Sequence, residues 1–300
     1  MTSLAILYEH PAWFAPLFAA LDRRGIDHAL LTPGTAFDPA DTSVPAPLIL
    51  NRIAMSAFLR EGEHPIFWAQ SLLAQWEAAG ARVLNGTRAL AIDTSKARQL
   101  ALISRLGFAI PATRVVHRAA DVVAAADSIG FPLVVKANIG GAGAGIVRFD
   151  SRDELRAAVE DGGLPGSIDG VLLVQLLVPI RGGTITRIET LDRDYLYAID
   201  VAGGGAFDLC PADACVAGSG ISMAAVEPPA ALREAAEAIA RAAHLDLGGV
   251  EVMIDDRCGT PRFYDINALS NFVARPLEVL GWDPHDRLVD RIVRWGQETI

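Results

Sequence analysis

Short hydrophobic runs typical of strands alternate with longer stretches of helical spacing along most of the chain. In the first third, the runs predict strands at Leu4–Tyr8, Ile26–Leu31 and Leu48–Leu50 and amphipathic helices at Ala12–Arg24 and Pro65–Ala79. A glycine directly follows each helix and ends it. This alternation predicts a small Rossmann-like α/β domain over residues 1–92. No G-x-G-x-x-G motif follows its first strand, so we do not expect dinucleotide binding there.

The same pattern predicts two further units, over residues 93–177 and 178–300. The second unit combines helices at 96–105, 120–129 and 152–160 with strands at 132–136 and 171–177. The third combines strands near 184–191 and 195–201, a loop at 208–222, a helix at 229–243, a hairpin at 249–267 and a packing helix at 282–295. A chain of 300 residues that is 51% hydrophobic can build three such cores.

The basic residues of the chain are very unevenly divided, because it has 24 arginines and only two lysines, Lys96 and Lys136. A guanidinium is a planar fork, whereas an ammonium group is a compact charge that can enter a crowded phosphate site. Both lysines are therefore candidates for ligand contact. The alternative is that each is an ordinary solvated charge. Lys96 lies in the first turn of a predicted helix that Thr94 or Ser95 can cap, and Lys136 ends a buried, β-branched strand.

A glycine-rich loop follows the strand of Lys136, with glycines at Gly140, Gly141, Gly143 and Gly145. Without a Cβ, the backbone N–H groups of such a loop can approach phosphate oxygens closely, which predicts a phosphate-binding flap. A simple hairpin turn is the alternative. The lysines are not placed as a Walker A loop requires, and in protein kinases the glycine loop precedes the strand lysine.

Two strand-like runs at 249–255 and 261–267 flank a turn-rich segment and predict an antiparallel hairpin. If the hairpin is centred on Cys258, Glu251 lies opposite Asp265, and Asp265 and Asn267 point to the same face. Two opposed carboxylates and an amide are suited to one or two hard cations. The alternative is a surface hairpin with solvated acids.

These motifs, in this order, resemble those of the ATP-grasp enzymes, particularly RimK-type glutamate ligases, glutathione synthetase and D-alanine:D-alanine ligase. The resemblance spans residues 93–272 and implies an α+β ATP-grasp fold in which two subdomains clamp ATP behind a preceding Rossmann-like domain. It also implies that Lys96 and Lys136 contact the nucleotide phosphates. Leu173-Val174-Gln175-Leu176-Leu177 matches the family's adenine-binding hinge, and this places adenine on Gln175, Leu176 and Leu177.

The family's metal set, an Asp followed by Glu-x-Asn, appears here as Glu251 followed by Asp265-Ile266-Asn267. Because the two acids exchange lengths, the charge and reach of the set are preserved. Arg187 matches the arginine of the family's G-x-D-[IV]-R motif, where Ile185 replaces the Asp. The resemblance implies that Arg187 meets the transferring phosphoryl group, a role that suits a guanidinium fork.

Substrate contacts are expected from two places in the sequence. Asn51-Arg52 follows a strand and resembles a substrate-binding pair of related ligases. The family's N-x-S-P-G motif after the metal Asn is replaced by Asn267-Ala268-Leu269-Ser270-Asn271, which lacks the Pro-Gly. Ser270, Asn271 and Arg275 are therefore candidate substrate residues in a loop whose shape departs from that of the relatives.

The implied activity is an ATP-dependent carboxylate–amine ligation through an acyl phosphate, with Arg187 and Lys136 as catalytic residues and Mg²⁺, or Mn²⁺, as the metal. The two substrates would be a small carboxylate and a small amine, with amino acids as candidates. Three alternatives stay open: thiol ligation, simple phosphorylation, and ATP binding without turnover in a regulatory protein.

Composition narrows the partners and the compartment. The net charge of −10 argues against a nucleic-acid partner. Three cysteines without a C-x-x-C motif argue against disulfides and structural zinc and lead us to expect a cytoplasmic protein. The first residues lack signal-peptide features, and no stretch approaches the ~20 apolar residues of a membrane span. A homodimer is expected from the family resemblance alone.

Overall fold

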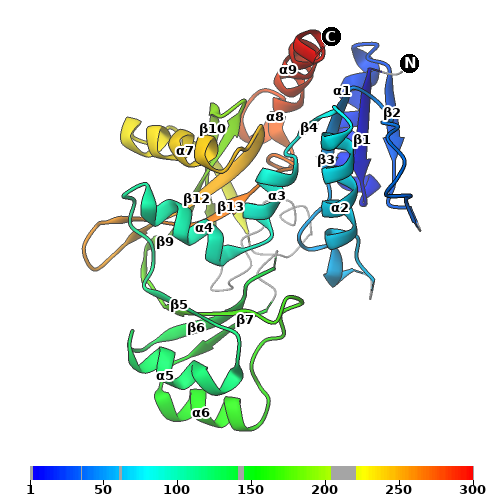
Figure 1. Cartoon of the computed structure of the whole chain (residues 1–300). Helices are drawn as coiled ribbons and strands as arrows, with labels where there is room; N and C mark the ends of the chain where they lie inside the picture. The colour runs from blue at the N-terminus through cyan, green and yellow to red at the C-terminus, as the bar shows by residue number, and fades with distance from the viewer. Residues whose placement is uncertain (1–2, 35, 61–62, 141–144, 204–220, 300) are drawn as a thin grey trace.

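The structure, a computed structural model, describes residues 3–34, 36–60, 63–140, 145–203 and 221–299. Three separate sheets organise these residues, two of four strands and one of five. Figure 1 shows the first sheet on one side of the molecule, the five-stranded sheet across its middle and the other four-stranded sheet below. The predicted arrangement of two α+β units preceded by a parallel α/β unit agrees with these three sheets.

The first sheet is parallel and has the strand order β2-β1-β3-β4. Its elements are β1 (Leu4–Tyr8), α1 (Pro11–Arg23), β2 (His28–Leu31), β3 (Leu48–Arg52), the short 3₁₀ turn Ala57–Leu59, α2 (Ile66–Ala78) and β4 (Arg82–Leu84). Strand β4 was not predicted, because three residues show no clear period. The helix at the end of the chain, α9 (Pro284–Thr299), packs on α1 and buries Trp295.

The second sheet is antiparallel and has the order β5-β8-β6-β7. Its elements are β5 (Thr113–Val116), the 3₁₀ turn Ala119–Asp121, α5 (Val122–Asp127), β6 (Leu133–Ala137), β7 (Ile146–Phe149), α6 (Arg152–Glu160) and β8 (Leu172–Leu176). Helices α5 and α6 enclose a small core with three of the strands. The predicted glycine flap connects β6 to β7. Residues 141–144 lie outside the described part of the chain.

The third sheet is also antiparallel and has the order β11-β10-β9-β12-β13. Its strands are β9 (Ile180–Leu191), β10 (Asp194–Ala202), β11 (Ser222–Val226), β12 (Leu247–Asp255) and β13 (Pro261–Asn267). Three helices pack against it: α3 (Thr87–Asp93), α4 (Lys96–Arg105) and α7 (Ala230–Ala242). The short helix α8 (Pro276–Val279) precedes α9. Most of the predicted loop at 208–222 lies outside the described residues.

One helix packs differently from its predicted place. We assigned α4 to the unit over residues 93–177, but its apolar face, with Leu102 and Ile103, packs on the third sheet beside α7. Figure 1 shows α4 next to α3 and α7 and away from α5 and α6. Helical spacing identifies the apolar face of a helix but not the surface that covers it. Lys96 therefore lies on a helix that packs against the third sheet, and the same sheet contains the predicted metal residues.

Candidate functional site

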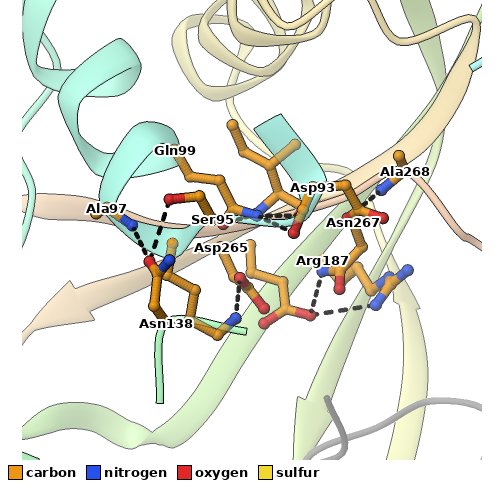
Figure 2. A network of polar contacts seen from close by, with 12 residues as sticks. Asp93, Ser95, Ala97, Gln99, Asn138, Arg187, Asp265, Asn267 and Ala268 are labelled. Atoms are coloured by element: carbon orange, nitrogen blue, oxygen red, sulfur yellow. Dashed lines mark hydrogen bonds and ion pairs between the residues drawn. The ribbon is translucent and has the colours of Figure 1, made fainter. Parts of the chain in front are cut away.

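The first turn of α4 brings Lys96 onto the hairpin. Of the two predicted capping residues, Thr94 and Ser95, it is Ser95 that caps the helix, because its hydroxyl accepts a hydrogen bond from the Arg98 backbone N–H at 3.3 Å. Lys96 Nζ then lies 2.5 Å from Asp265 Oδ1, and both side chains are largely buried. A dashed line at Asp265 in Figure 2 marks this ion pair.

The end of β6 is tied to the same helix by Asn138, a residue that the sequence analysis missed. The Asn138 amide oxygen accepts from the Ala97 N–H at 2.9 Å and from the Ser95 hydroxyl at 3.2 Å. Its backbone carbonyl accepts from the Lys96 N–H at 3.1 Å. Because Asn138 follows Lys136 by two residues, these bonds hold the two lysine-bearing elements together (Figure 2). An asparagine at a strand end next to a glycine loop was the available signal.

The hairpin forms with the predicted register. Strands β12 and β13 pair Glu251 with Asp265 and Gly249 with Asn267. The Asn267 amide donates to Glu251 Oε1 at 3.2 Å, so the side chains meet on one face. The strands shift register after Glu251, and this bulge lies next to the acidic pair.

Arg187 joins this group from the neighbouring strand β9, where it pairs with Glu251 across the sheet. Its Nη1 donates to Glu251 Oε1 at 3.1 Å and its Nε donates to Glu189 Oε1 at 2.6 Å. Gly249 leaves the space for these contacts, since a Cβ there would lie 2.7 Å from Arg187 Nε and 2.9 Å from Glu189 Oε1. The buried guanidinium therefore bridges two buried carboxylates, which provide its compensating charge.

Burial and crowding of like charges shift the pKa values in this group. Burial raises the pKa of Glu251, and the charge of Asp265 raises it further, against the opposing effect of Arg187. Burial lowers the pKa of Lys96, but the charge and hydrogen bond of Asp265, together with the charges of Glu251 and Asp93, outweigh that effect and the net pKa is raised. For Lys136, burial followed by repulsion from Lys96 lowers the pKa from the usual 10.5 to about 8. The raised pKa of Glu251, a buried carboxylate beside a second carboxylate, marks a place where a further cation is favourable.

The donor set suits a hard divalent cation. Glu251 and Asp265 supply carboxylate oxygens, and Asn267 has an amide oxygen besides the N–H₂ group that it donates to Glu251. Mg²⁺ and Mn²⁺ prefer such oxygen ligands. In the described part of the chain, no cluster of three or more His, Cys, Asp or Glu side chains is arranged to hold a metal. The predicted set does not depend on such a cluster, since its third member is an asparagine.

An apolar cavity of about 130 Å³ adjoins Lys136 and the predicted adenine hinge. It is lined by Lys136, by the three hinge residues at 175–177, and by side chains that include Val178, Met253 and Tyr264. The N–H of Leu176 donates to the Ala112 carbonyl at 2.9 Å and that of Leu177 to the Pro132 carbonyl at 3.0 Å. An adenine contact in this segment would therefore use other backbone atoms. The Gln175 amide is held by Thr113 Oγ1 at 2.8 Å.

The predicted flap begins and ends beside β6, the strand that contains Lys136. Gly145 has a φ of +71° and its carbonyl accepts from the Ala137 N–H at 3.0 Å. A side chain is strained at that φ, which explains a glycine here. Gly140 is described and is partly buried. Gly141 and Gly143, also predicted to bind phosphate, lie outside the described residues.

Two of the predicted substrate residues, Arg52 and Ser270, meet at the carboxyl end of β3. Arg52 is 2% exposed, and its Nη2 donates to the backbone carbonyl of Ser270. Burial lowers the pKa of Arg52 to about 10. In Asn51 both polar groups are used within the chain, since its amide donates to the Asn85 carbonyl and accepts from the Ile53 N–H, each at 3.1 Å. Arg275 is exposed and pairs with Glu278 at 3.0 Å.

Two side chains that the sequence analysis missed, the buried Asn85 and the partly buried Asp93, connect this region to the hairpin. Asn85 donates to the Ala268 carbonyl at 2.6 Å and to the Leu247 carbonyl at 2.7 Å, and its amide oxygen accepts from the Asp246 N–H at 2.8 Å. Its φ of +50° suits an asparagine after a strand, which was the only signal. Asp93 accepts from the Ala268 N–H at 3.1 Å, and burial raises its pKa to about 7. Figure 2 shows the hydrogen bond between Ala268 and Asp93.

Comparison with known proteins agrees with this geometry. The model of the RimK-like ATP-grasp domain matches residues 93–272, the span that carries both lysines, the hinge and the hairpin. The chain belongs to the RimK-like ATP-grasp family. A relative named ribosomal protein bS6–L-glutamate ligase, from Shigella boydii, is 29% identical over 211 residues, which cover 70% of this chain and 67% of the relative.

Two solved ATP-grasp structures resemble the whole chain. The ATP-grasp ligase PsnB, complexed with a variant of its minimal precursor, Mg and ADP, has a TM-score of 0.72 at 16% identity and covers 98% of this chain and 99% of its own. The D-alanine–D-alanine ligase of Bacillus anthracis, complexed with ATP, has a TM-score of 0.70 at 16% identity and covers 99% of this chain and 98% of its own. At these identities the likeness concerns the fold. Among the described residues of this RimK-like chain, no helix combines the length and apolarity needed to span a bilayer.

Proposed function

We propose that this chain is an ATP-dependent carboxylate–amine ligase that forms an amide bond through an acyl phosphate. The carboxylate oxygen attacks the γ-phosphorus of ATP, and the bond from that phosphorus to the β,γ-bridging oxygen breaks to release ADP. The amine then attacks the acyl carbon, phosphate leaves, and the amine loses a proton. Two of the similar proteins are named ribosomal protein bS6–L-glutamate ligase and D-alanine–D-alanine ligase, and both names support this reaction class.

The observation that carries the proposal is the meeting of cationic side chains with the acidic hairpin. Lys96 forms an ion pair with Asp265, and Arg187 forms one with Glu251. Lys136 is buried nearby. Charge that develops on a transferring phosphoryl group is stabilised by preorganised cations, and positioning supplies most of the remaining rate enhancement. We assign phosphate contacts to the two lysines and stabilisation of the transferring group to Arg187.

The metal residues and the hinge complete the assignment. Glu251, Asp265 and Asn267 would hold Mg²⁺, or Mn²⁺ in its place, and a bound divalent ion neutralises phosphate charge. The apolar cavity beside Gln175 offers a slot for adenine. Ser270 and Asn271, which follow the metal Asn by a few residues, are assigned to substrate. The domain boundaries at 92/93 and 177/178, a homodimer and a cytoplasmic location stay predictions.

The test is ADP release by the purified full-length chain with ATP, Mg²⁺ and pools of amino acids and other small carboxylates and amines. Ligation requires that ADP release depends on both a carboxylate and an amine, and that hydroxylamine, supplied in place of the amine, is converted into a hydroxamate. Asp265→Asn is expected to abolish release. The matched control is Asp194→Asn, since Asp194 is exposed at the first position of β10.

The rival activities give different results in the same assay. Release that needs a thiol identifies a thiol ligase, and release with a carboxylate alone, leaving a stable phosphorylated product, identifies a kinase. ATP binding without ADP release under every condition would refute the ligase and indicate a regulatory protein.

A further inference from the structure

A second cavity, of about 660 Å³, lies between the first sheet and the loop that follows the metal hairpin. One wall comes from the start of α1, with His10 and Trp13, and the other from the segment that begins at Asn271 and Phe272. The cavity volume is in the range typical of small-molecule sites. Its position at the carboxyl end of β1 is the edge of a parallel sheet where ligands usually bind.

One short loop joins a wall of the cavity to the strand that carries the predicted metal residues. Asn267 stands at the end of β13, and four residues later Asn271 already lines the cavity. Arg52 anchors this loop to the first sheet through the Ser270 carbonyl. The residue that follows Asn267 by four positions therefore contacts any ligand bound in the cavity near Asn271.

The chemistry of the walls favours an apolar occupant. Trp13 stacks on His10 with ring centroids 4.5 Å apart, and Leu277, at 69% exposure, presents an uncovered apolar side chain beside them. The charged groups of the wall are paired with one another, since Arg275 meets Glu278 at 3.0 Å. Asp283 likewise holds the ring of His285 at 2.8 Å. These paired charges therefore give the walls no preference for a ligand with a charged side chain.

One polar atom of the wall has a different character. Asn271 Oδ1 is buried and has no hydrogen-bond partner among the described residues. A buried acceptor without a donor costs free energy, and a ligand N–H would satisfy it. The two backbone positions around it that carry large side chains at positive φ, Phe272 (+60°) and Arg275 (+53°), show that the loop is held in an unusual shape. This is the segment where the family's Pro-Gly is missing.

We propose that this cavity binds the amine substrate, with its N–H group on Asn271 Oδ1 and a large apolar side chain between Trp13 and Phe272. The inference rests on the proposed ligase function and adds a substrate class to it. The amine is that of a hydrophobic amino acid or of a peptide that begins with one.

The test is calorimetric titration of the full-length chain, loaded with Mg²⁺ and ADP, with matched amines. The probes are phenylalanine, leucine, alanine and glycine, each as the free acid and as the amide. Phenylalanine and leucine are expected to bind at least about tenfold more tightly than glycine, as a filled apolar pocket provides. Ala274→Phe, which places a ring inside the cavity, is expected to remove that preference. Ala231→Phe is the control, because Ala231 is exposed on α7.

Each result decides the proposal separately from the ligase assay. No binding of any probe, a preference for glycine or alanine, or an apolar preference that persists in Ala274→Phe would overturn the pocket. Asn271→Ala is expected to weaken all amines by a similar factor, whatever their side chain. If the apolar preference is present without ADP release, the pocket stands and the ligase fails. If ADP release needs only a small or acidic amine, the ligase stands and the pocket fails.

Discussion

Replacing Lys136 by methionine is expected to stabilise the folded protein and to abolish its proposed activity. Lys136 is 5% exposed, and burial followed by repulsion from Lys96 lowers its pKa from the usual 10.5 to about 8. At pH 7 the folded chain must therefore carry a buried charge that the unfolded chain carries in water. At about 1.4 kcal/mol per pKa unit, this depression costs about 3 kcal/mol of folding free energy.

The sign of the pH dependence follows from the same shift. Between pH 8 and pH 10.5 the unfolded chain keeps the proton on Lys136 and the folded chain loses it, so the free energy of unfolding rises with pH. Below pH 8 both states are protonated and the full penalty is present. Lys136→Met removes the penalty and this rise together. Since methionine has a similar length and no charge, the packing of β6 is retained.

Scanning calorimetry at pH 7 and at pH 9.5 measures both effects. We expect an unfolding midpoint several degrees higher in Lys136→Met at pH 7, and a smaller difference at pH 9.5. The other lysine provides the control, because Asp265 raises the pKa of Lys96, and Lys96→Met is expected to destabilise. A Lys136→Met variant that is no more stable than the parent at pH 7 would refute the reasoning. Lys136→Arg keeps a charge and is expected to lose turnover without gaining stability.

Three further predictions concern the buried polar groups. Arg187→Met leaves two buried carboxylates without their partner and is expected to lower stability by about 3–5 kcal/mol in urea unfolding, with Arg187→Lys in between; a loss below 1 kcal/mol would contradict this. Asn85→Ala removes the hydrogen bonds that join β4 to the hairpin and is expected to cost about 2–4 kcal/mol by the same measurement, whereas a neutral effect would show that these bonds are replaced by water. Asp265→Asn is expected to weaken Mn²⁺ binding, followed by electron paramagnetic resonance, at least about tenfold, and an unchanged affinity would remove Asp265 from the metal set.

Local sequence determined the elements that carry the chemistry. The register of the hairpin follows from alternation around a short turn, so Glu251 opposite Asp265 was predicted correctly. The start of α4 at Lys96 was predicted from the hydroxyls of Thr94 and Ser95, because a capping hydroxyl acts within three residues, and Ser95 is the cap. The rarity of lysine singled out Lys96 and Lys136 as candidate ligand contacts, and Lys136 is 5% exposed. The hairpin register and the helix cap depend on segments that are close in the sequence, and the lysine count depends on composition alone.

Tertiary structure alone decided which charges are paired. Lys96 and Asp265 are 169 residues apart, and Arg187 and Glu251 are 64 apart, so no local period relates them. Packing of α4 on the third sheet, which the sequence did not reveal, puts Lys96 on the hairpin. Asn85 and Asn138 became visible only as the connections between sheets. Periodicity specifies which face of an element is buried, whereas the fold as a whole decides which other element covers that face.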